Sequence, residues 1–460
     1  MVEIERLLTL CMITANAHCR VIKTSGRNTM GEKIVSSVNE TKETGEVQTK
    51  KRFIIVFCLF IGIFIAYLDR VNVSVLAAND PFLLEMGIKG APVQIGMMMS
   101  VFLAAYGVAN VLLAPIGDYL GPRKSMMLCI GLWTASLFLG GVASTFAIII
   151  VSRIMLGVGE GMYYPLQSVF VKNWFPRHER GRANAAWVVG QSVAPALAMP
   201  FFAYLIGNYG WRANFHFCLV VGLIPLYLLW RHTADTPRQH KSINKAELAH
   251  IEAGQEVTAS KEVALPLGQR LKGFIGNYRY WLLVFWYLCL QCMYWGLITW
   301  LPSYLKTARG FSWSEMGWLA SLPFVLSIIF KVSCGFLTDK IGRSAPILMA
   351  AMFFAGCCVY LGAVAEQKYL SAVLLSLAVA FCTMGTPVAW TLLQGLIPGS
   401  SMSTASGIMN GLANGFASLA PAMIGFFIST TGQYSSGLLC LVFTGAAATI
   451  AAGILAAKRY

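Results

Sequence analysis

Long apolar runs alternate with short polar connections along most of this chain. Twelve runs have about the twenty residues that a helix needs to cross a hydrocarbon layer roughly 30 Å thick. The pattern therefore predicts an all-α membrane protein with twelve transmembrane helices. We place them at 53–76, 94–117, 124–143, 146–168, 183–206, 212–232, 279–301, 316–338, 345–365, 369–391, 404–428 and 435–457.

Two stretches of the chain lack such a run. Residues 1–52 form a polar tail, and the charged stretch 233–278 contains a helix-like segment, Ile243–Glu256. These stretches predict four units: the tail 1–52, a six-helix bundle at 53–232, a linker loop at 233–278 and a second six-helix bundle at 279–457. Met30 begins a polar segment of its own, and we hypothesise that translation starts there.

The composition agrees with a membrane protein. Apolar residues make up 57% of the chain and charged residues 12%, whereas about 45–50% and about 25% are usual in globular proteins. So few charges cannot cover a soluble surface, which excludes a soluble enzyme, a disordered scaffold and a secreted disulfide module. Cys289 and Cys292 have CxxC spacing but stand alone, without a second pair or nearby histidines, and the six histidines show no HxxxH spacing, so no metal site is predicted.

The basic residues predict the orientation of the chain. If the N-terminus lies inside, the inner segments hold 27 Lys and Arg and the outer loops hold 5, with 3 more inside spans. Basic residues gather on the cytoplasmic side of membrane proteins, so both termini are predicted to be cytoplasmic. The same distribution explains the net charge of +15 without a nucleic-acid partner.

A short charged motif occurs twice, at corresponding places in the two halves. Asp118 is followed by Gly121 and by Arg123-Lys124 after the second span, and Asp339 is followed by Gly342-Arg343 after the eighth. The two aspartates are 221 residues apart, which indicates an internal repeat of six helices. Asp118, Arg123, Asp339 and Arg343 are therefore predicted to form a latch that opens and closes as the bundles rock. Two coincidental turns with solvated charges are the alternative.

The motif Asp-x-x-Gly-x-(Arg/Lys) resembles the hallmark loop of the major facilitator superfamily, although Pro122 is a slight departure in the first copy. Further motifs are similar to the anion:cation symporter family, which includes galactonate, hexuronate, glucarate and tartrate carriers. They are Tyr67–Asn72, Arg153–Glu160, Trp174-Phe175-Pro176, Glu179-Arg180-Gly181, Trp300-Leu301-Pro302-x-Tyr304 and Trp390.

Five ionisable residues fall inside predicted spans: Asp69, Arg70, Arg153, Glu160 and Lys331. A charge at a helix centre costs roughly 2.5–3.5 kcal/mol, so these groups should face a wet cavity or one another. Asp69 and Arg153 both lie roughly 10 Å from the outer surface and can pair. Glu160 shares a face with Arg153 but lies two turns deeper, too far for direct contact.

These charges suggest a mechanism. Protonation of Asp69 and Glu160 in the outward-open state would free Arg70 and Arg153, and Arg70 could then hold a carboxylate with two hydrogen bonds. The family resemblance implies the same roles, with Asp69 and Glu160 as proton sites, Arg153 tuning them and Arg70 binding substrate. The alternative is a static charge network that locks the first span to the fourth.

Uncharged residues supply further candidates for substrate binding. Tyr67 lies one turn before Arg70 and can offer its hydroxyl group to the same ligand. Hydroxyls of a polyol need amide partners, and an indole face suits its C–H groups. The other candidates are Tyr106, Gln191 and, by the family resemblance, Trp390 and Asn410. Helix packing explains each of them nearly as well, and for Asn414 we favour packing.

Lys331 departs from the family pattern, which usually has an uncharged residue there. We hypothesise that it is a second cationic contact for a substrate with two anionic ends, a sulfonate or a phosphate. Alternatively, its side chain extends to the inner surface or caps a helix.

The sequence thus predicts a proton-coupled symporter that brings a sugar acid or small carboxylate into the cell by alternating access. Its expected partners are the anion, protons and the lipid bilayer, with no cofactor, and we expect a monomer in a bacterial inner membrane. No nucleotide-binding loop is present. The alternatives are an organophosphate/phosphate exchanger and a nutrient receptor that does not transport; a membrane enzyme lacks a nucleophile–base pair.

Overall fold

The structure is a computed structural model that describes residues 49–113, 120–176, 179–253, 271–341, 343–397 and 402–458. Most of the polar tail, including Met30, and Asp118 of the predicted latch lie outside these residues. All regular elements of the described residues are helical. The all-α class that the sequence predicts is therefore confirmed.

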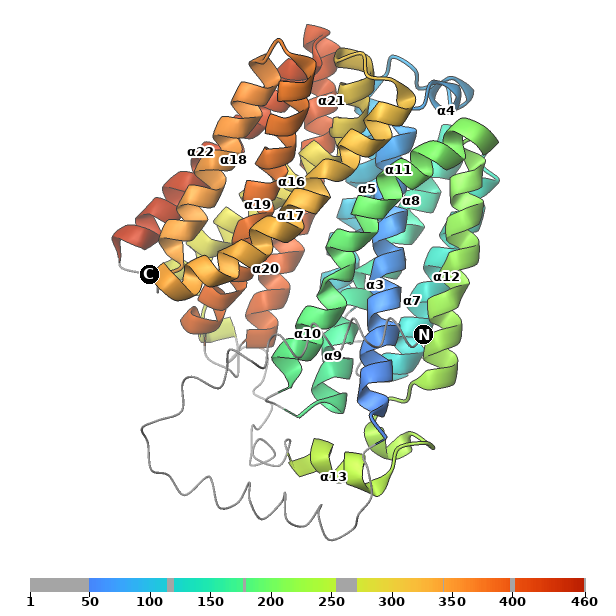
Figure 1. The fold of residues 1–460 in the computed structure, drawn as a ribbon, viewed down its shortest axis with the longest axis vertical. Coiled ribbons are helices and arrows are strands. Elements are labelled where there is room, and N and C mark those ends of the chain that lie inside the picture. The colour runs from blue at the N-terminus through green and yellow to red at the C-terminus, as the bar shows by residue number, and fades with distance from the viewer. Residues whose placement is uncertain are drawn as a thin grey trace.

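The first half of the chain folds into helices that lie together on one side of the molecule (Figure 1). Asn79 caps α4, because its side chain accepts a hydrogen bond of 2.9 Å from the amide of Phe82. The helices of this half are α3 (Lys51–Leu76), α4 (Asp80–Glu85), α5 (Pro92–Leu112), α7 (Pro122–Gly141), α8 (Phe146–Gly161), α9 (Tyr163–Trp174), α10 (Arg180–Val188), α11 (Gly190–Tyr209) and α12 (Arg212–His232).

The second half packs beside the first and reaches it through α16, α17, α20 and α21 (Figure 1). Its helices are α16 (Tyr278–Ser303), the π-helical turn η2 (Tyr304–Ala308), α17 (Trp313–Ile341), α18 (Ala345–Val364), α19 (Lys368–Leu396), α20 (Met402–Ala417), α21 (Leu419–Thr431) and α22 (Tyr434–Ala457). Two long stretches of helices thus face each other across a central interface.

Eleven helical segments of the described residues are long and apolar enough to cross a membrane. The segment predicted as the fourth span, 146–168, is divided at Met162 between α8 and α9. With 16 residues, α8 is about 24 Å long, which is shorter than the hydrocarbon core. The count of twelve spans remains a prediction.

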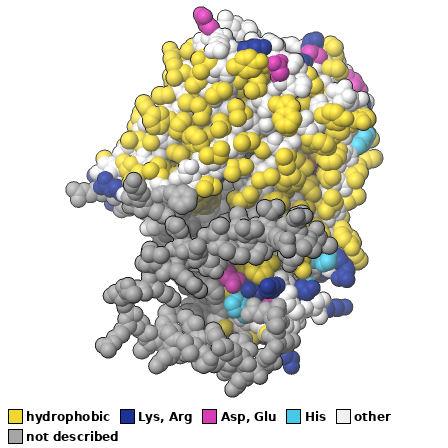
Figure 2. All heavy atoms as spheres, viewed as in Figure 1, with side chains coloured by type: hydrophobic (Ala, Val, Ile, Leu, Met, Phe, Trp, Pro, Cys, Tyr) yellow, Lys and Arg dark blue, Asp and Glu magenta, His cyan; other side chains and the backbone are white. Residues whose placement is uncertain are grey.

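The surface of the helical part is apolar. Figure 2 shows hydrophobic side chains over most of the visible helical face, with charged groups towards its ends. Large apolar side chains such as Phe443 and Trp318 are 78% and 67% exposed. Such a surface would aggregate in water, and it fits a lipid environment.

The linker carries a short helix, α13 (Lys245–Ala253), inside the predicted segment Ile243–Glu256. Glu247 on α13 accepts hydrogen bonds from the amides of Lys51 and Arg52 at the start of α3, at 2.8 and 3.1 Å. The Arg52 guanidinium contacts both Glu247 (3.2 Å) and Glu179 (2.9 Å). Burial raises the pKa of Glu179, but hydrogen bonds from His250 and Arg52 outweigh burial and lower this pKa to about 2. The linker helix is thereby attached to the base of the first half.

Candidate functional site

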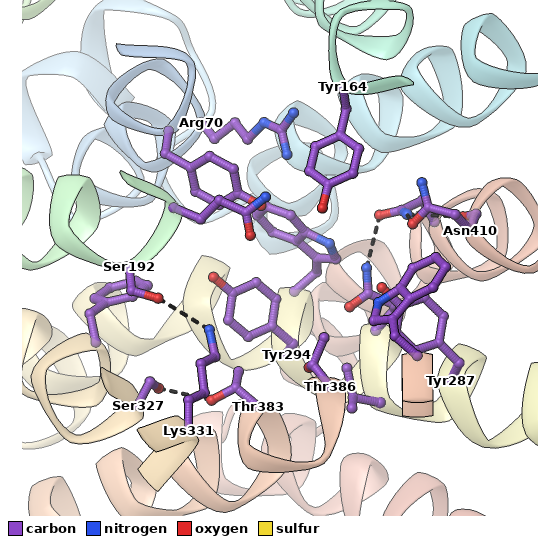
Figure 3. Close-up of a pocket in the computed structure, with 18 of the residues that line it drawn as sticks. Arg70, Tyr164, Ser192, Tyr287, Tyr294, Ser327, Lys331, Thr383, Thr386 and Asn410 are labelled. Atoms are coloured by element: carbon purple, nitrogen blue, oxygen red, sulfur yellow. Dashed lines mark hydrogen bonds between the residues drawn. The ribbon is translucent and has the colours of Figure 1, made fainter. Parts of the chain in front are cut away.

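A pocket of about 100 Å³ lies between the two halves of the chain (Figure 3). One ordered water needs roughly 10–15 Å³, so the pocket can hold a small ligand. All seven residues predicted to bind substrate line this pocket: Tyr67, Arg70, Tyr106, Gln191, Lys331, Trp390 and Asn410. They come from helices of both halves, so the pocket is formed only where the two halves meet.

Arg70 is the cation that the first half contributes to the pocket. Its guanidinium forms an ion pair with Glu160 of α8, and both side chains are buried. It also lies 4.6 Å from the ring centre of Tyr67 and 4.8 Å from that of Tyr106. These rings stabilise a guanidinium electrostatically and fix its plane. From the sequence we expected Asp69 and Glu160 to hold Arg70 and Arg153 by internal pairing, without assigning Glu160 to Arg70.

Asp69 lies next to Arg70 in the chain but does not line the pocket. It is fully buried, and its neighbours include Cys218 of α12 and Arg153 of α8. Arg153 contacts the main chain of Asp69, donating to its carbonyl oxygen at 3.5 Å. This differs from the expected pairing of the two side chains, because both carboxylate oxygens of Asp69 are buried without a hydrogen-bond partner in the described structure.

Lys331 lies on α17 and points into the pocket (Figure 3). Its ammonium group donates a hydrogen bond of 3.1 Å to the hydroxyl of Ser192 on α11, in the opposite half. In this structure the side chain of Lys331 therefore does not extend to the inner surface, which was one of the alternatives. Whether Lys331 binds substrate remains a prediction.

Several polar residues of the pocket were not singled out from the sequence. Tyr287, Gln291 and Tyr294 line it from α16. Their spacing of four and three residues puts them on one helix face, a signal that was present in the sequence. Gln291 donates to Asn414 at 3.1 Å, and Asn414 donates to Asn410 at 3.1 Å. Asn414 thus lies in the pocket wall, although we favoured packing for it. The other polar lining residues are Tyr164, Ser192, Ser327, Thr383 and Thr386.

The predicted latch is only partly described. Asp339 lies in the last turn of α17, but the structure describes only its backbone. Arg343 is exposed. The amide of Arg123 donates to Asp235 at 2.7 Å, and its guanidinium donates to the carbonyl of Leu229 at 3.3 Å. Arg123 is therefore bound to the end of α12 within its own half. The role of these four residues as a latch stays a prediction.

The two halves also meet at the end of the molecule that carries α4, opposite α13 (Figure 1). Ser303 donates to the carbonyl of Ala77 at 2.7 Å. Lys306 donates to the carbonyl of Ala78 at 2.8 Å and to the carboxylate of Asp80 at 2.6 Å. The hydrogen bond from Lys306 lowers the pKa of Asp80. These contacts join the segment from the end of α3 to the start of α4 with the end of α16 and with η2.

Glycines bring the two backbones together at the same end. A Cβ atom on Gly96 of α5 would lie 2.3 Å from the carbonyl oxygen of Pro421 on α21. A Cβ on Gly425 would lie 2.4 Å from the carbonyl oxygen of Pro92. Such reciprocal approaches need residues without a side chain at both crossings. The α4 end of the interface is therefore tightly closed.

Comparisons with known proteins agree with this architecture. The chain is 30% identical to the probable sulfoacetate transporter SauU of Cupriavidus necator, over 84% of this chain and 89% of the relative. It is 28% identical to the probable galactarate/D-glucarate transporter GudP of Bacillus subtilis (88% and 91% covered) and 29% identical to the probable L-galactonate transporter of Escherichia coli (85% and 87%). These relatives are transporters, not enzymes.

Solved structures show the same fold. A bacterial homolog of the human lysosomal transporter Spinster, in an inward-facing and unoccupied conformation, superimposes with a TM-score of 0.70. The match covers 88% of this chain and 96% of that one, at 16% sequence identity. The apolar helices and the bacterial relatives identify a multi-pass protein of a bacterial inner membrane. The model of the Major Facilitator Superfamily matches residues 59–423, and the chain therefore belongs to that superfamily.

Proposed function

We propose that this protein is a secondary active symporter that takes up a small organic anion, a sugar acid or short carboxylate, together with protons. The relatives are carriers of such anions, which supports the substrate class. The observation that carries the coupling is the buried ion pair between Arg70 and Glu160 at the pocket. The substrate anion would then bind Arg70, and the proton would bind Glu160, the two partners of this ion pair.

The coupling follows from the charges. While Glu160 is ionised, it neutralises Arg70, and an incoming carboxylate would have to compete with an anion already in place. A proton on Glu160 removes that competitor and leaves Arg70 free to bind the substrate carboxylate with two hydrogen bonds. Loss of the proton inside restores the pair and expels the substrate. Binding of the proton therefore raises the affinity for the anion, and binding of the anion raises the affinity for the proton.

Asp69 is proposed as a second proton site. It is fully buried, one residue before Arg70, and a hydrogen bond joins its main chain to Arg153 of α8. A charge change at Asp69 would alter the packing of α3 against α8 and α12, and thus the position of Arg70. This couples the proton to the helix that carries the substrate cation, without contact between Asp69 and the substrate.

Transport further requires that the pocket opens to each side in turn. We propose that both termini are cytoplasmic, that the α4 end faces outwards, and that two six-helix bundles rock about the pocket in a monomer. The contacts of Ser303, Lys306 and the paired glycines at the α4 end support an outer gate that is closed in this structure. The basic inner segments support the orientation.

Uptake into proteoliposomes with an alkaline interior tests the proposal. The panel contains galactonate, gluconate, glucuronate, glucarate, galactarate, tartrate, sulfoacetate and a sugar phosphate. We expect at least one acid to accumulate above equilibrium only with the pH gradient. Glu160→Gln and Asp69→Asn should abolish accumulation, and Asp69→Asn should still exchange substrate across the membrane. Glu366→Gln, at an exposed loop position, is the matched control and should transport normally. Accumulation that ignores the pH gradient would refute proton coupling.

An organophosphate/phosphate exchanger is the second candidate, and the presence of both Arg70 and Lys331 in the pocket favours it. Two cations could grip a phosphate from opposite halves. In that case phosphate-loaded vesicles would take up the sugar phosphate, and the pH gradient would have no effect. Uptake of a carboxylic acid under the pH gradient alone would exclude this candidate. A receptor without transport would bind an acid and accumulate none.

A further inference from the structure

Lys331 is a charge in the pocket that proton coupling does not use. Its ammonium group contacts the neutral hydroxyl of Ser192. The described residues that line the pocket include two cations, Arg70 and Lys331, and no carboxylate. Glu160 reaches Arg70 from behind the pocket wall, whereas no ion pair to Lys331 occurs among the described residues. A cation inside a membrane span is costly when no anion lies beside it. We therefore expect the anion at Lys331 to come from outside the protein.

The two cations belong to opposite halves of the molecule. Arg70 lies on α3 and Lys331 on α17, and in Figure 3 they stand on different sides of the pocket. Tyr294 lies between them in this view, with its hydroxyl group facing the pocket. Gln191 precedes Ser192, the partner of Lys331, and lines the same wall. Hydroxyl and amide groups thus lie along the path from one cation to the other.

The balance of charge selects the kind of ligand. The five intramembrane ionisable residues carry three positive and two negative formal charges. Protonation of Glu160 frees Arg70, and the described pocket lining then holds two cations without a protein anion beside them. A monoanion would leave one of them uncompensated, whereas a molecule with an anion at each end would satisfy both.

We propose that the substrate is a small dianion, with one anionic group on Arg70 and the other on Lys331. This inference rests on the proposed function and specifies its substrate class. Lys331 becomes the residue that discriminates dianions from monoanions of the same length. Because the two contacts come from different halves, the bound dianion also bridges the interface across which the halves move.

A matched pair of ligands tests the proposal. Galactarate and galactonate share one carbon skeleton and differ in having two carboxylates or one. Their dissociation constants would be measured calorimetrically on the purified full chain at one fixed pH. Wild type should bind galactarate at least tenfold more tightly than galactonate. Lys331→Met should weaken galactarate binding roughly 10- to 100-fold, the cost of a hydrogen bond to a charged group, and change galactonate binding less than threefold. Sulfoacetate, a shorter dianion, should show whether the second group can be a sulfonate.

Two further variants separate charge from packing. Lys331→Arg keeps the charge and should retain the preference for galactarate. Ser192→Ala removes the hydroxyl partner of Lys331 and should also retain it, because the ammonium group stays. Galactonate binding by Lys331→Met within threefold of wild type would show that this variant is folded.

The outcomes distinguish the two proposals. If wild type binds both acids equally, or if Lys331→Met loses affinity for both in the same proportion, the dianion assignment is wrong, although proton-driven uptake of a monoanion can still stand. If galactarate binding depends on Lys331 but no acid accumulates in proteoliposomes, the dianion site stands and the proposed symport fails. Binding of neither acid by wild type, while tartrate or sulfoacetate binds equally well to wild type and Lys331→Met, would also overturn the assignment.

Discussion

The crossing of α5 and α21 offers a direct test of the proposed outer gate. Replacing Gly96 by alanine puts a methyl group 2.3 Å from the carbonyl oxygen of Pro421 and 2.7 Å from its carbonyl carbon. Both atoms belong to the backbone and cannot turn aside as a side chain would. We therefore expect the closed gate to be lost selectively, because the open gate separates these two helices.

The size of the effect follows from the overlap. Forcing a methyl group into a packed contact costs about 1–3 kcal/mol. Since the open state does not bear this cost, the equilibrium between closed and open gates should shift by about 5- to 150-fold. A protein that is mostly closed would become mixed or mostly open. Uptake should fall, because the carrier can no longer complete its cycle at the normal rate.

Distances between the two halves would report the shift. Probes attached through noncanonical amino acids at Leu84 and Gln433 avoid the native cysteines, and both residues are exposed at the α4 end. Gly96→Ala should move the distance distribution to longer values. Gly131→Ala on α7 is the matched control, because its Cβ would meet nothing within 4 Å. An unchanged distribution in Gly96→Ala, with normal uptake, would show that this crossing is not a gate.

Two more predictions concern the ends of the molecule. In the described structure Lys306 is the only charged contact of Asp80 from the opposite half. Lys306→Met removes it and should shift part of the probe distance distribution to longer values. Its effect should be smaller than that of Gly96→Ala, because an exposed pair contributes about 0–1 kcal/mol; an equal or larger shift would contradict this ranking. At the other end, the lowered pKa of Glu179 stabilises the attachment of α13 above the ordinary carboxylate pKa. That stability should disappear as the pH falls from about 4.5 to about 2. The distance between probes at Lys241 and Lys172 should then increase. A distance that stays constant down to about pH 2 would refute this prediction.

The sequence was sufficient for features that depend on one helix at a time. Runs of apolar residues located the helices, and spacing along a helix put Tyr67 one turn from Arg70, where both line the pocket. The repeated motif indicated two related halves, and the boundary between them at the linker stays a prediction. Gln291 could have been added by the same reasoning, because it shares a face with Tyr287 and Tyr294.

Features that depend on the rotation of one helix against another were not predictable. The depth of Glu160 was compared with that of Arg153 on its own helix, yet its partner is Arg70 on α3. Asp69 and Arg153 lie at similar depth, but Arg153 contacts the main-chain carbonyl of Asp69 and not its carboxylate. The break at Met162 is different, because the sequence does signal it. Glycines precede it at 157, 159 and 161, and Pro165 inside the predicted span cannot donate the helical hydrogen bond to the carbonyl of Gly161.

The contacts at the end of α3 have a consequence for how this gate can vary in evolution. Ser303 and Lys306 bind the carbonyl oxygens of Ala77 and Ala78, which follow the last turn of the helix and lack helical partners. Every amino acid supplies such a carbonyl. Substitutions at positions 77 and 78 can therefore leave the contact intact, and the serine and lysine can persist without any matching change opposite them. Covariation between the halves would overlook this part of the gate, although it joins them directly.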